Sequence, residues 1–141
     1  MTDSMPTSPA IISIAAALLI GKEGKMLLVR KHNTLIFMQP GGKIEPSEQP
    51  IQALIRELRE ELQLIVDPAQ LDYIGQYQAP AANEPGCMVK AELFKLYCEA
   101  DITCAAEIAE SIWIDPSAPI DQPIAPLTRD FVIPLCPSLH H

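Results

Sequence analysis

Hydrophobic and polar residues follow two different periods along the chain, and the first part has the pattern of strands. Residues 10–20 are a continuous run of aliphatic and small side chains, which predicts a buried strand. A turn of Gly and charged residues at 21–25 separates this run from a second apolar segment at 26–29, so the two are expected to form a hairpin. A short third strand is predicted at 35–37 and ends before Pro40-Gly41-Gly42.

The clearest helical pattern spans residues 47–65. Its apolar positions recur at intervals of three and four residues, which is typical of an amphipathic helix that packs on one side. Ser47 is the expected N-cap, Pro50 falls in the first turn, where proline is tolerated, and Pro68 follows the helix. The apolar stripe consists of Ile51, Leu54, Ile55, Leu58, Leu62 and Ile65.

The second half of the chain returns to strand patterns. Two long strands and a short last strand are predicted, followed by a proline-dense loop and a short helix. These elements are expected at 71–78, 88–97, 112–114, 116–127 and 128–133. Because strands surround one strong helix, we predict a mixed α/β sandwich rather than a repeat of βαβ units.

Length and charge narrow the classes of function. The chain has 141 residues, which is the size of one domain, and we expect this domain at 10–139, after a flexible segment at 1–9. His140 and His141 resemble the start of a purification tag. The formal net charge of −8 excludes binding of long nucleic acids through their phosphates, because the protein's field repels a polyanion.

The sequence predicts a cytoplasmic protein that does not bind membranes. The longest apolar run is too short for a bilayer, which requires about 20 residues. The first nine residues contain no Lys or Arg, so they do not form a secretory signal. Four cysteines without a CxxC pair favour free thiols over a zinc site or a disulfide scaffold.

Candidate chemistry is concentrated on the predicted helix. At about 100° per residue, Glu57, Glu60 and Glu61 occupy one sector roughly 100° wide, on the shoulder of the apolar stripe. Like charges at this spacing repel each other, and carboxylate oxygens suit Mg²⁺ or Mn²⁺ as the compensating cation. Taken alone, such a run is more often a solvated helix face, so the wider spacing has to decide between the two interpretations.

The wider spacing resembles the Nudix box, whose pattern is G-x5-E-x7-R-E-U-x-E-E-x-G-U, with U an aliphatic residue. Gly42, Glu48 and the segment 56–61 occupy the matching positions, and Leu64 supplies the last aliphatic residue. The family has Gly at the position of Gln63. Gln63 therefore either continues the helix or adopts a positive φ, which costs on the order of 1 kcal/mol.

The resemblance implies a Nudix-type α/β/α sandwich with a mixed β-sheet and one catalytic loop–helix–loop. It also implies a Mg²⁺-dependent hydrolase, with Mn²⁺ as an alternative, that cleaves the pyrophosphate bond of a nucleoside diphosphate linked to another moiety, such as a nucleoside triphosphate. Homodimers are frequent in the family, so a homodimer stays open. The catalytic candidates that match the motif are Glu57, Glu60, Glu61 and Arg56.

The resemblance also assigns separate roles within the box. Glu57, Glu60 and Glu61 match the acids that bind metal, and one of them, or an acid from another loop, is the candidate base. Gly42 matches the glycine whose backbone carbonyl approaches the metal. Glu48 and Arg56 match positions that brace the loop and orient the acids.

Several residues outside the box are weaker candidates. Glu107 lies before the last strand, where some members place an extra metal-binding or basic acid, and a solvated role is equally consistent. Arg30 and Lys31 end the second strand and are candidates for phosphate binding, although surface solvation is the stronger interpretation. Asn83 and Glu84 lie in a loop that is a candidate for contact with the leaving moiety. The alternative function is a non-catalytic nucleotide-binding or sensing module on the same fold, which the Gln63 departure motivates.

Overall fold

The computed structural model describes residues 10–82 and 84–135, so the predictions for 1–9 and 140–141 lie outside the described residues. Seven strands form one sheet, and one long helix, α1 (Pro50–Leu62), packs on it. The strands are β1 (Ala10–Ile20), β2 (Met26–Lys31), β3 (Phe37–Met38), β4 (Gly41–Lys43), β5 (Leu71–Pro80), β6 (Cys87–Tyr97) and β7 (Ile108–Ile114). Short helical turns lie at Lys22–Gly24, Pro68–Gln70 and Thr128–Val132.

The sheet is mixed, as predicted. Its strands follow the order β3-β2-β1-β6-β5, while β4 pairs with β1 and β7 pairs with β2. β1 and β6 are parallel over their whole length, from Ala10 opposite Cys87 to Ile20 opposite Tyr97, and the other pairs are antiparallel. The pairing of Gly41–Lys43 with the middle of β1 places this segment at the centre of the sheet.

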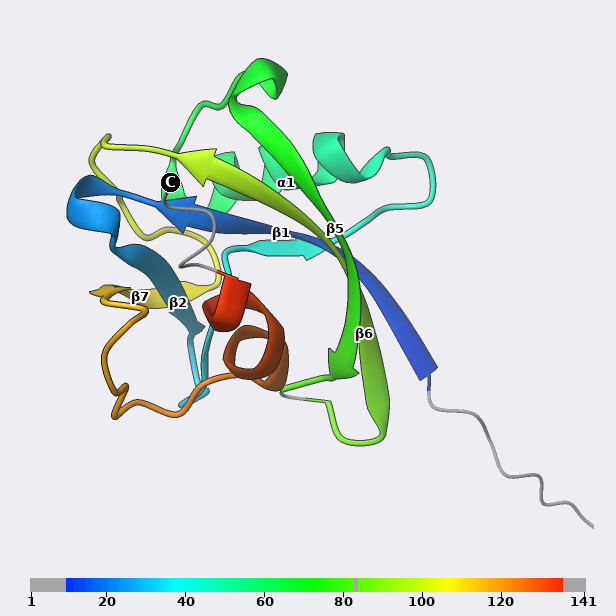
Figure 1. Ribbon diagram of the computed structural model, residues 1–141. Helices are drawn as coiled ribbons and strands as arrows, with labels where there is room; N and C mark the ends of the chain where they lie inside the picture. Colours follow the sequence, from blue (N-terminus) through cyan, green and yellow to red (C-terminus); the bar gives the residue numbers. More distant parts are fainter. Residues whose placement is uncertain (1–9, 83, 136–141) are drawn as a thin grey trace, which may run out of the picture.

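The sheet has a hydrophobic core on each face because β1 is apolar on both sides. Ala15, Ala17 and Leu19 pack in the cluster that includes the buried face of α1. The intervening residues of β1 pack in the opposite cluster, with Leu127 and Val132 of the C-terminal helical segment. Figure 1 shows α1 and this orange-red segment on opposite sides of the sheet, which confirms the α/β/α sandwich.

The helix is shorter than predicted at both ends. Gln49, not Ser47, is the N-cap, and it exchanges hydrogen bonds with Gln52 in a capping box. At the other end Gln63 has φ 55° and ψ 34°, a left-handed conformation that ends the helix. Ile65 therefore points into solvent, so its assignment to the apolar stripe was wrong.

Gln63 resolves the alternatives that the sequence left open. Its N–H donates to the carbonyl of Arg59 at 3.0 Å, and the N–H of Leu64 donates to the carbonyl of Leu58 at 3.2 Å. The bond from Gln63 to Arg59 is the one that defines the αL C-cap motif, whose left-handed residue is usually Gly. Gln63 thus takes the conformation expected of the family's glycine.

The short strands differ from the predictions more than the long ones. The third strand lies at Phe37–Met38 rather than 35–37, and Leu35 is exposed. β4 was not predicted, because its three residues follow a proline and include two glycines. β7 begins four residues earlier than expected, at Ile108. The predicted helix at 128–133 is confirmed, with π-helical geometry at Thr128–Val132.

The predictions about membrane spans and cysteines can be compared with the described residues. No helix within residues 10–82 and 84–135 is both long and apolar enough to cross a bilayer. Cys87, Cys98 and Cys104 are free thiols, as expected, and Cys136 lies outside the described residues.

Candidate active site

The acidic turn of α1 lies directly against β4. The N–H of Gly41 donates to Oε1 of Glu61 at 3.2 Å. A Cβ atom at Gly42 would lie 2.4 Å from Cδ of Glu57, so a larger residue there would displace this carboxylate. Gly41 and Gly42 thus allow the backbone of β4 to meet the carboxylates of Glu61 and Glu57.

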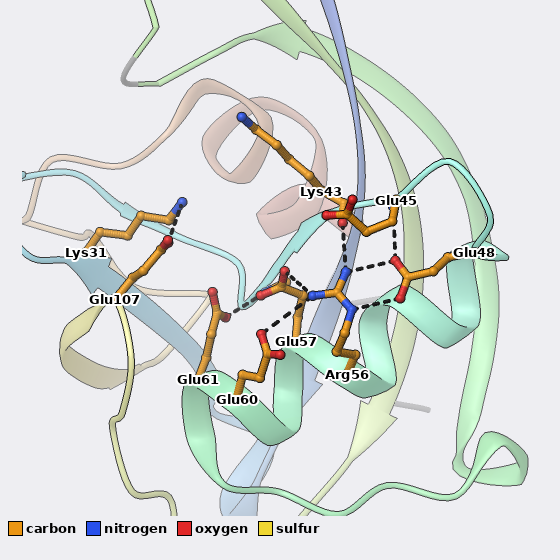
Figure 2. Close-up of polar contacts among 10 residues, drawn as sticks. Lys31, Lys43, Glu45, Glu48, Arg56, Glu57, Glu60, Glu61 and Glu107 are labelled. Carbon is orange, nitrogen blue, oxygen red and sulfur yellow. Dashed lines mark hydrogen bonds and ion pairs between the residues drawn. The ribbon is translucent and has the colours of Figure 1, made fainter.

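Arg56 holds the acids and the loop before the helix together. Its guanidinium binds Glu48 with two hydrogen bonds of 2.7 and 2.8 Å and donates to Glu57 at 3.0 Å. It also donates to the carbonyl of Lys43 at 3.2 Å and lies 3.5 Å from Oε1 of Glu60. Figure 2 shows this guanidinium between Glu48 on one side and Glu57 and Glu60 on the other.

The carboxylates have sharply different environments. The guanidinium of Arg56 and the N–H of Glu45 lower the pKa of Glu48 to about 2. Burial raises the pKa of Glu57, although Arg56 opposes part of this shift. Glu61 is only 3% exposed, and its burial, together with the charge of Glu57, raises its pKa to about 8.

The oxygen donors of this cluster suit a hard divalent cation, but they do not form a ready-made site. Within the described parts of the chain, no three His, Cys, Asp or Glu side chains are gathered closely enough to hold a metal ion. The charges of Glu60 and Glu107 raise the pKa of Glu57, and those of Glu57 and Glu107 raise that of Glu61. A cation bound among these carboxylates would remove this repulsion, so the residues fit Mg²⁺ or Mn²⁺.

Glu107 and Lys31 lie beside the acidic turn, while Arg30 does not. Nζ of Lys31 lies 3.5 Å from Oε1 of Glu107, and Figure 2 shows this pair across from Glu61. Arg30 instead binds Glu110 at 2.9 Å and the carbonyl of Thr34 at 2.8 Å. The structure therefore brings Glu107 and Lys31 to the site and leaves Arg30 in a separate ion pair.

A pocket of about 500 Å³ opens on the other side of β4. Its walls are mainly apolar and come from β1, β6, the β5–β6 loop and the C-terminal helical segment. Both glycines of β4, Lys31 and Glu107 line it, and the same glycines contact Glu61 and Glu57, so the pocket adjoins the acidic site. Four of the polar residues in the pocket wall are Gln39, Lys43, Glu84 and Thr128.

Sequence reasoning missed three of these four residues. Lys43 follows the two glycines directly, and this position inside the motif was a usable signal. Gln39 and Thr128 are 89 residues apart in the sequence (from 39 to 128), and no local pattern links them. Glu84 was predicted from its loop and does line the pocket, whereas Asn83 lies outside the described residues.

Comparison with known proteins identifies relatives over most of the chain. A CTP pyrophosphohydrolase from Escherichia coli is 30% identical over 121 residues, which cover 82% of this chain and 84% of the relative. An 8-oxo-dGTP diphosphatase from Haemophilus influenzae is 35% identical over 74 residues, or 50% of this chain and 54% of that protein.

Solved structures agree with this relationship. The Escherichia coli ORF135 protein is 26% identical, covers 94% of this chain and 91% of its own, and superposes with a TM-score of 0.66. The MutT protein of Methanosarcina mazei is also 26% identical, with coverages of 78% and 80% and a TM-score of 0.65. The family profile of the NUDIX domain matches residues 11–131. With this match, and with the acids of the motif placed on α1 beside β4, the chain belongs to the Nudix domain family.

Proposed function

We propose that this protein hydrolyses a phosphoanhydride bond in a nucleoside diphosphate linked to another moiety, with a nucleoside triphosphate as the first candidate. One observation carries the proposal: a helical turn with three carboxylates brings Glu61 against Gly41 and Glu57 against Gly42, and both glycines line a pocket of about 500 Å³. A volume of this size is within the usual range for small-molecule sites. The names of the two relatives, a pyrophosphohydrolase and a diphosphatase, support the same class of reaction.

The carboxylates divide between metal binding and proton transfer. Glu57, Glu60 and Glu61 would hold Mg²⁺ or Mn²⁺, which when bound neutralises phosphate charge and lowers the pKa of water. One of these acids, or Glu107, accepts the proton of the attacking water. The water oxygen forms a new bond to phosphorus, the anhydride P–O bond breaks, and the leaving phosphate keeps the bridging oxygen.

The cationic side chains have separate tasks in this proposal. Arg56 positions Glu57 and Glu60 and ties them to the loop through Glu48, since it hydrogen-bonds to Glu48 and Glu57 and forms an ion pair with Glu60. Lys31 and Lys43 line the pocket beside the glycines and offer positive charge to the phosphates. This arrangement reconciles an acidic protein with a small polyanionic substrate, because the local charge is set by metal and lysine.

A screen of nucleotide hydrolysis, with the products separated by ion-exchange chromatography, tests the proposal. Nucleoside triphosphates, nucleotide sugars, dinucleoside polyphosphates and dinucleotide cofactors are assayed with Mg²⁺, with Mn²⁺ and with EDTA. The variant Glu60→Gln should lower turnover at least about 100-fold while the fold is retained, because this side chain is 49% exposed. Glu99→Gln, an exposed carboxylate after β6, is the matched control and should keep wild-type turnover. Full turnover of Glu60→Gln with Mg²⁺ present would refute the metal assignment.

The same screen separates this proposal from a non-catalytic nucleotide-binding module. Gln63 was the reason to consider such a module, because the family has Gly there. Gln63 takes the left-handed conformation that this glycine is expected to take, so the departure no longer favours the alternative. Binding of a nucleotide without hydrolysis of any of the compounds would favour the module.

A further inference from the structure

Two buried oxygen atoms at the pocket lack hydrogen-bond partners. Gln39 is 6% exposed and Thr128 is fully buried, and both residues line the pocket. Among the described residues, Oε1 of Gln39 and Oγ1 of Thr128 are buried side-chain oxygens without a partner. Buried polar atoms are nearly always hydrogen-bonded, and the exceptions are often functional. Two such atoms at one pocket therefore point to a ligand that supplies the missing bonds.

The amide of Gln39 is held in one orientation. Its Nε2 donates to the carbonyl of Ala17 at 3.1 Å and lies 3.6 Å from Sδ of Met26. Exchanging the amide ends would place Oε1 against the carbonyl of Ala17, with two acceptors facing each other. Oε1 is thus the free end, and it accepts hydrogen bonds but does not donate them.

Thr128 comes from a different part of the chain, the C-terminal helical segment. It opens the π-helical turn Thr128–Val132, and such turns occur frequently at functional sites. Its hydroxyl both donates and accepts, so it can pair with a ring nitrogen or with an N–H. The pair of Gln39 and Thr128 therefore offers one fixed acceptor and one adaptable group.

The rest of the pocket wall suits a flat aromatic ring. Ile14 of β1 and Val89 of β6 line one side, and Ala125 and Leu127 come from the C-terminal segment. An apolar slot with a few convergent polar atoms is the usual form of a site for a heterocycle. If the phosphates lie beside Gly41 and Gly42, the base of the same nucleotide extends into this slot.

We propose that Gln39 and Thr128 select a nucleobase with an exocyclic amino group next to a ring nitrogen, as in cytosine or adenine. This inference rests on the proposed function, since it places the base of that substrate. The amino group donates to Oε1 of Gln39, and the Thr128 hydroxyl donates to the adjacent ring nitrogen. An oxo group at the same position presents an acceptor to an acceptor, so uracil and hypoxanthine are disfavoured. Both protein oxygens are buried although their residues line the pocket, so the base reaches them after a local side-chain adjustment.

The test compares substrates that differ only at this group. Values of kcat/KM are measured for CTP against UTP and for ATP against ITP, with Mg²⁺. We expect the wild-type protein to prefer the amino base at least about tenfold in each pair. Thr128→Val keeps the shape and removes a hydroxyl that has no partner, so it should fold normally and reduce the preference to less than threefold. Gln39→Met should do the same.

The control is Thr34→Val, because Thr34 also lines the pocket but its hydroxyl already donates to the carbonyl of Lys31 at 2.9 Å. Its preference ratio should equal the wild-type ratio. Three results would overturn the base assignment but not the proposed hydrolase: a wild-type ratio near one, a preference for the oxo base, or an unchanged ratio in both Thr128→Val and Gln39→Met. If no nucleotide is hydrolysed, calorimetric binding of CTP and UTP decides instead: a tenfold preference for CTP supports the base assignment and refutes only the hydrolase. Equal binding, or no binding, refutes the base assignment as well.

Discussion

Glu61 makes the stability of the metal-free protein depend on pH in an unusual direction. Most carboxylates stabilise a fold as they ionise, because their folded-state pKa is lowered. Glu61 has the opposite shift, from 4.5 to about 8, since it is buried beside Glu57. Between these two values the unfolded chain carries an ionised Glu61 while the folded chain binds a proton. The stability that this group contributes is fully present below pH 4.5 and is lost as the pH rises toward 8.

The magnitude follows from proton linkage. One extra proton on the folded state makes the free energy of unfolding fall by 1.36 kcal/mol for each pH unit. From pH 6 to pH 8 the limit is therefore about 2.7 kcal/mol. Because the folded group is half ionised near pH 8 and its surroundings relax, we expect a loss of about 1–2 kcal/mol. The raised pKa of Glu57 acts in the same direction.

Urea denaturation in EDTA at pH 6 and pH 8 measures this loss. Glu61→Gln copies the protonated side chain and still accepts from the N–H of Gly41, so it should match the wild-type protein at pH 6 and exceed its stability at pH 8. Glu99→Gln is the control for loss of a carboxylate and should keep the wild-type pH dependence. Saturating Mg²⁺ should stabilise the wild type more at pH 8 than at pH 6, because carboxylates bind metal in their ionised form. Identical pH dependence in Glu61→Gln and wild type would show that Glu61 is not buried as described.

Three further substitutions probe the contacts that build the site. Gly42→Ala places a methyl group 2.4 Å from Cδ of Glu57. It should weaken Mg²⁺ binding about 10–100-fold by calorimetry, since it displaces that carboxylate, and unchanged affinity would contradict the contact. Gln63→Gly should raise the free energy of unfolding by about 1 kcal/mol, because Gln63 already has a positive φ, a conformation that costs less for glycine. We expect little effect on turnover. A loss of stability in urea would show that the side chain of Gln63 stabilises this turn. Leu58→Ala, in the fully buried face of α1, should lower the free energy of unfolding by about 2–5 kcal/mol, and a loss below 1 kcal/mol would contradict that packing.

The sequence predicted the elements whose patterns are local. The continuous apolar run of β1 and the three-to-four-residue period of α1 each extend over ten or more residues. Both elements could therefore be identified from the sequence. β3 and β4 contain two and three residues, which is too few to show a period. β4 exists because it pairs with β1, about 27 residues earlier in the chain, and such a contact leaves no local signal.

The candidate site was predictable only where its geometry is local to the helix. Helical geometry alone placed Glu57, Glu60 and Glu61 on one sector of α1. It did not distinguish Glu61, which is buried, from Glu60, which is about half exposed. That difference arises because Gly41 lies against Glu61, so the environment of each acid is set by β4 and not by the helix.

The end of α1 links the departure at Gln63 to the position of Glu107. A left-handed residue after Leu62 turns the chain away and leaves the last carbonyls of the helix free of intrahelical partners. The N–H of Thr103 donates to the carbonyl of Leu62 at 3.3 Å, and that of Ala105 donates to the carbonyl of Glu61 at 2.8 Å. These bonds hold the segment that leads to Glu107 at the acidic turn. A helix that continued through Gln63 would have used those carbonyls itself, so the strained conformation of Gln63 is what leaves them available to the loop that brings a fourth carboxylate to the site.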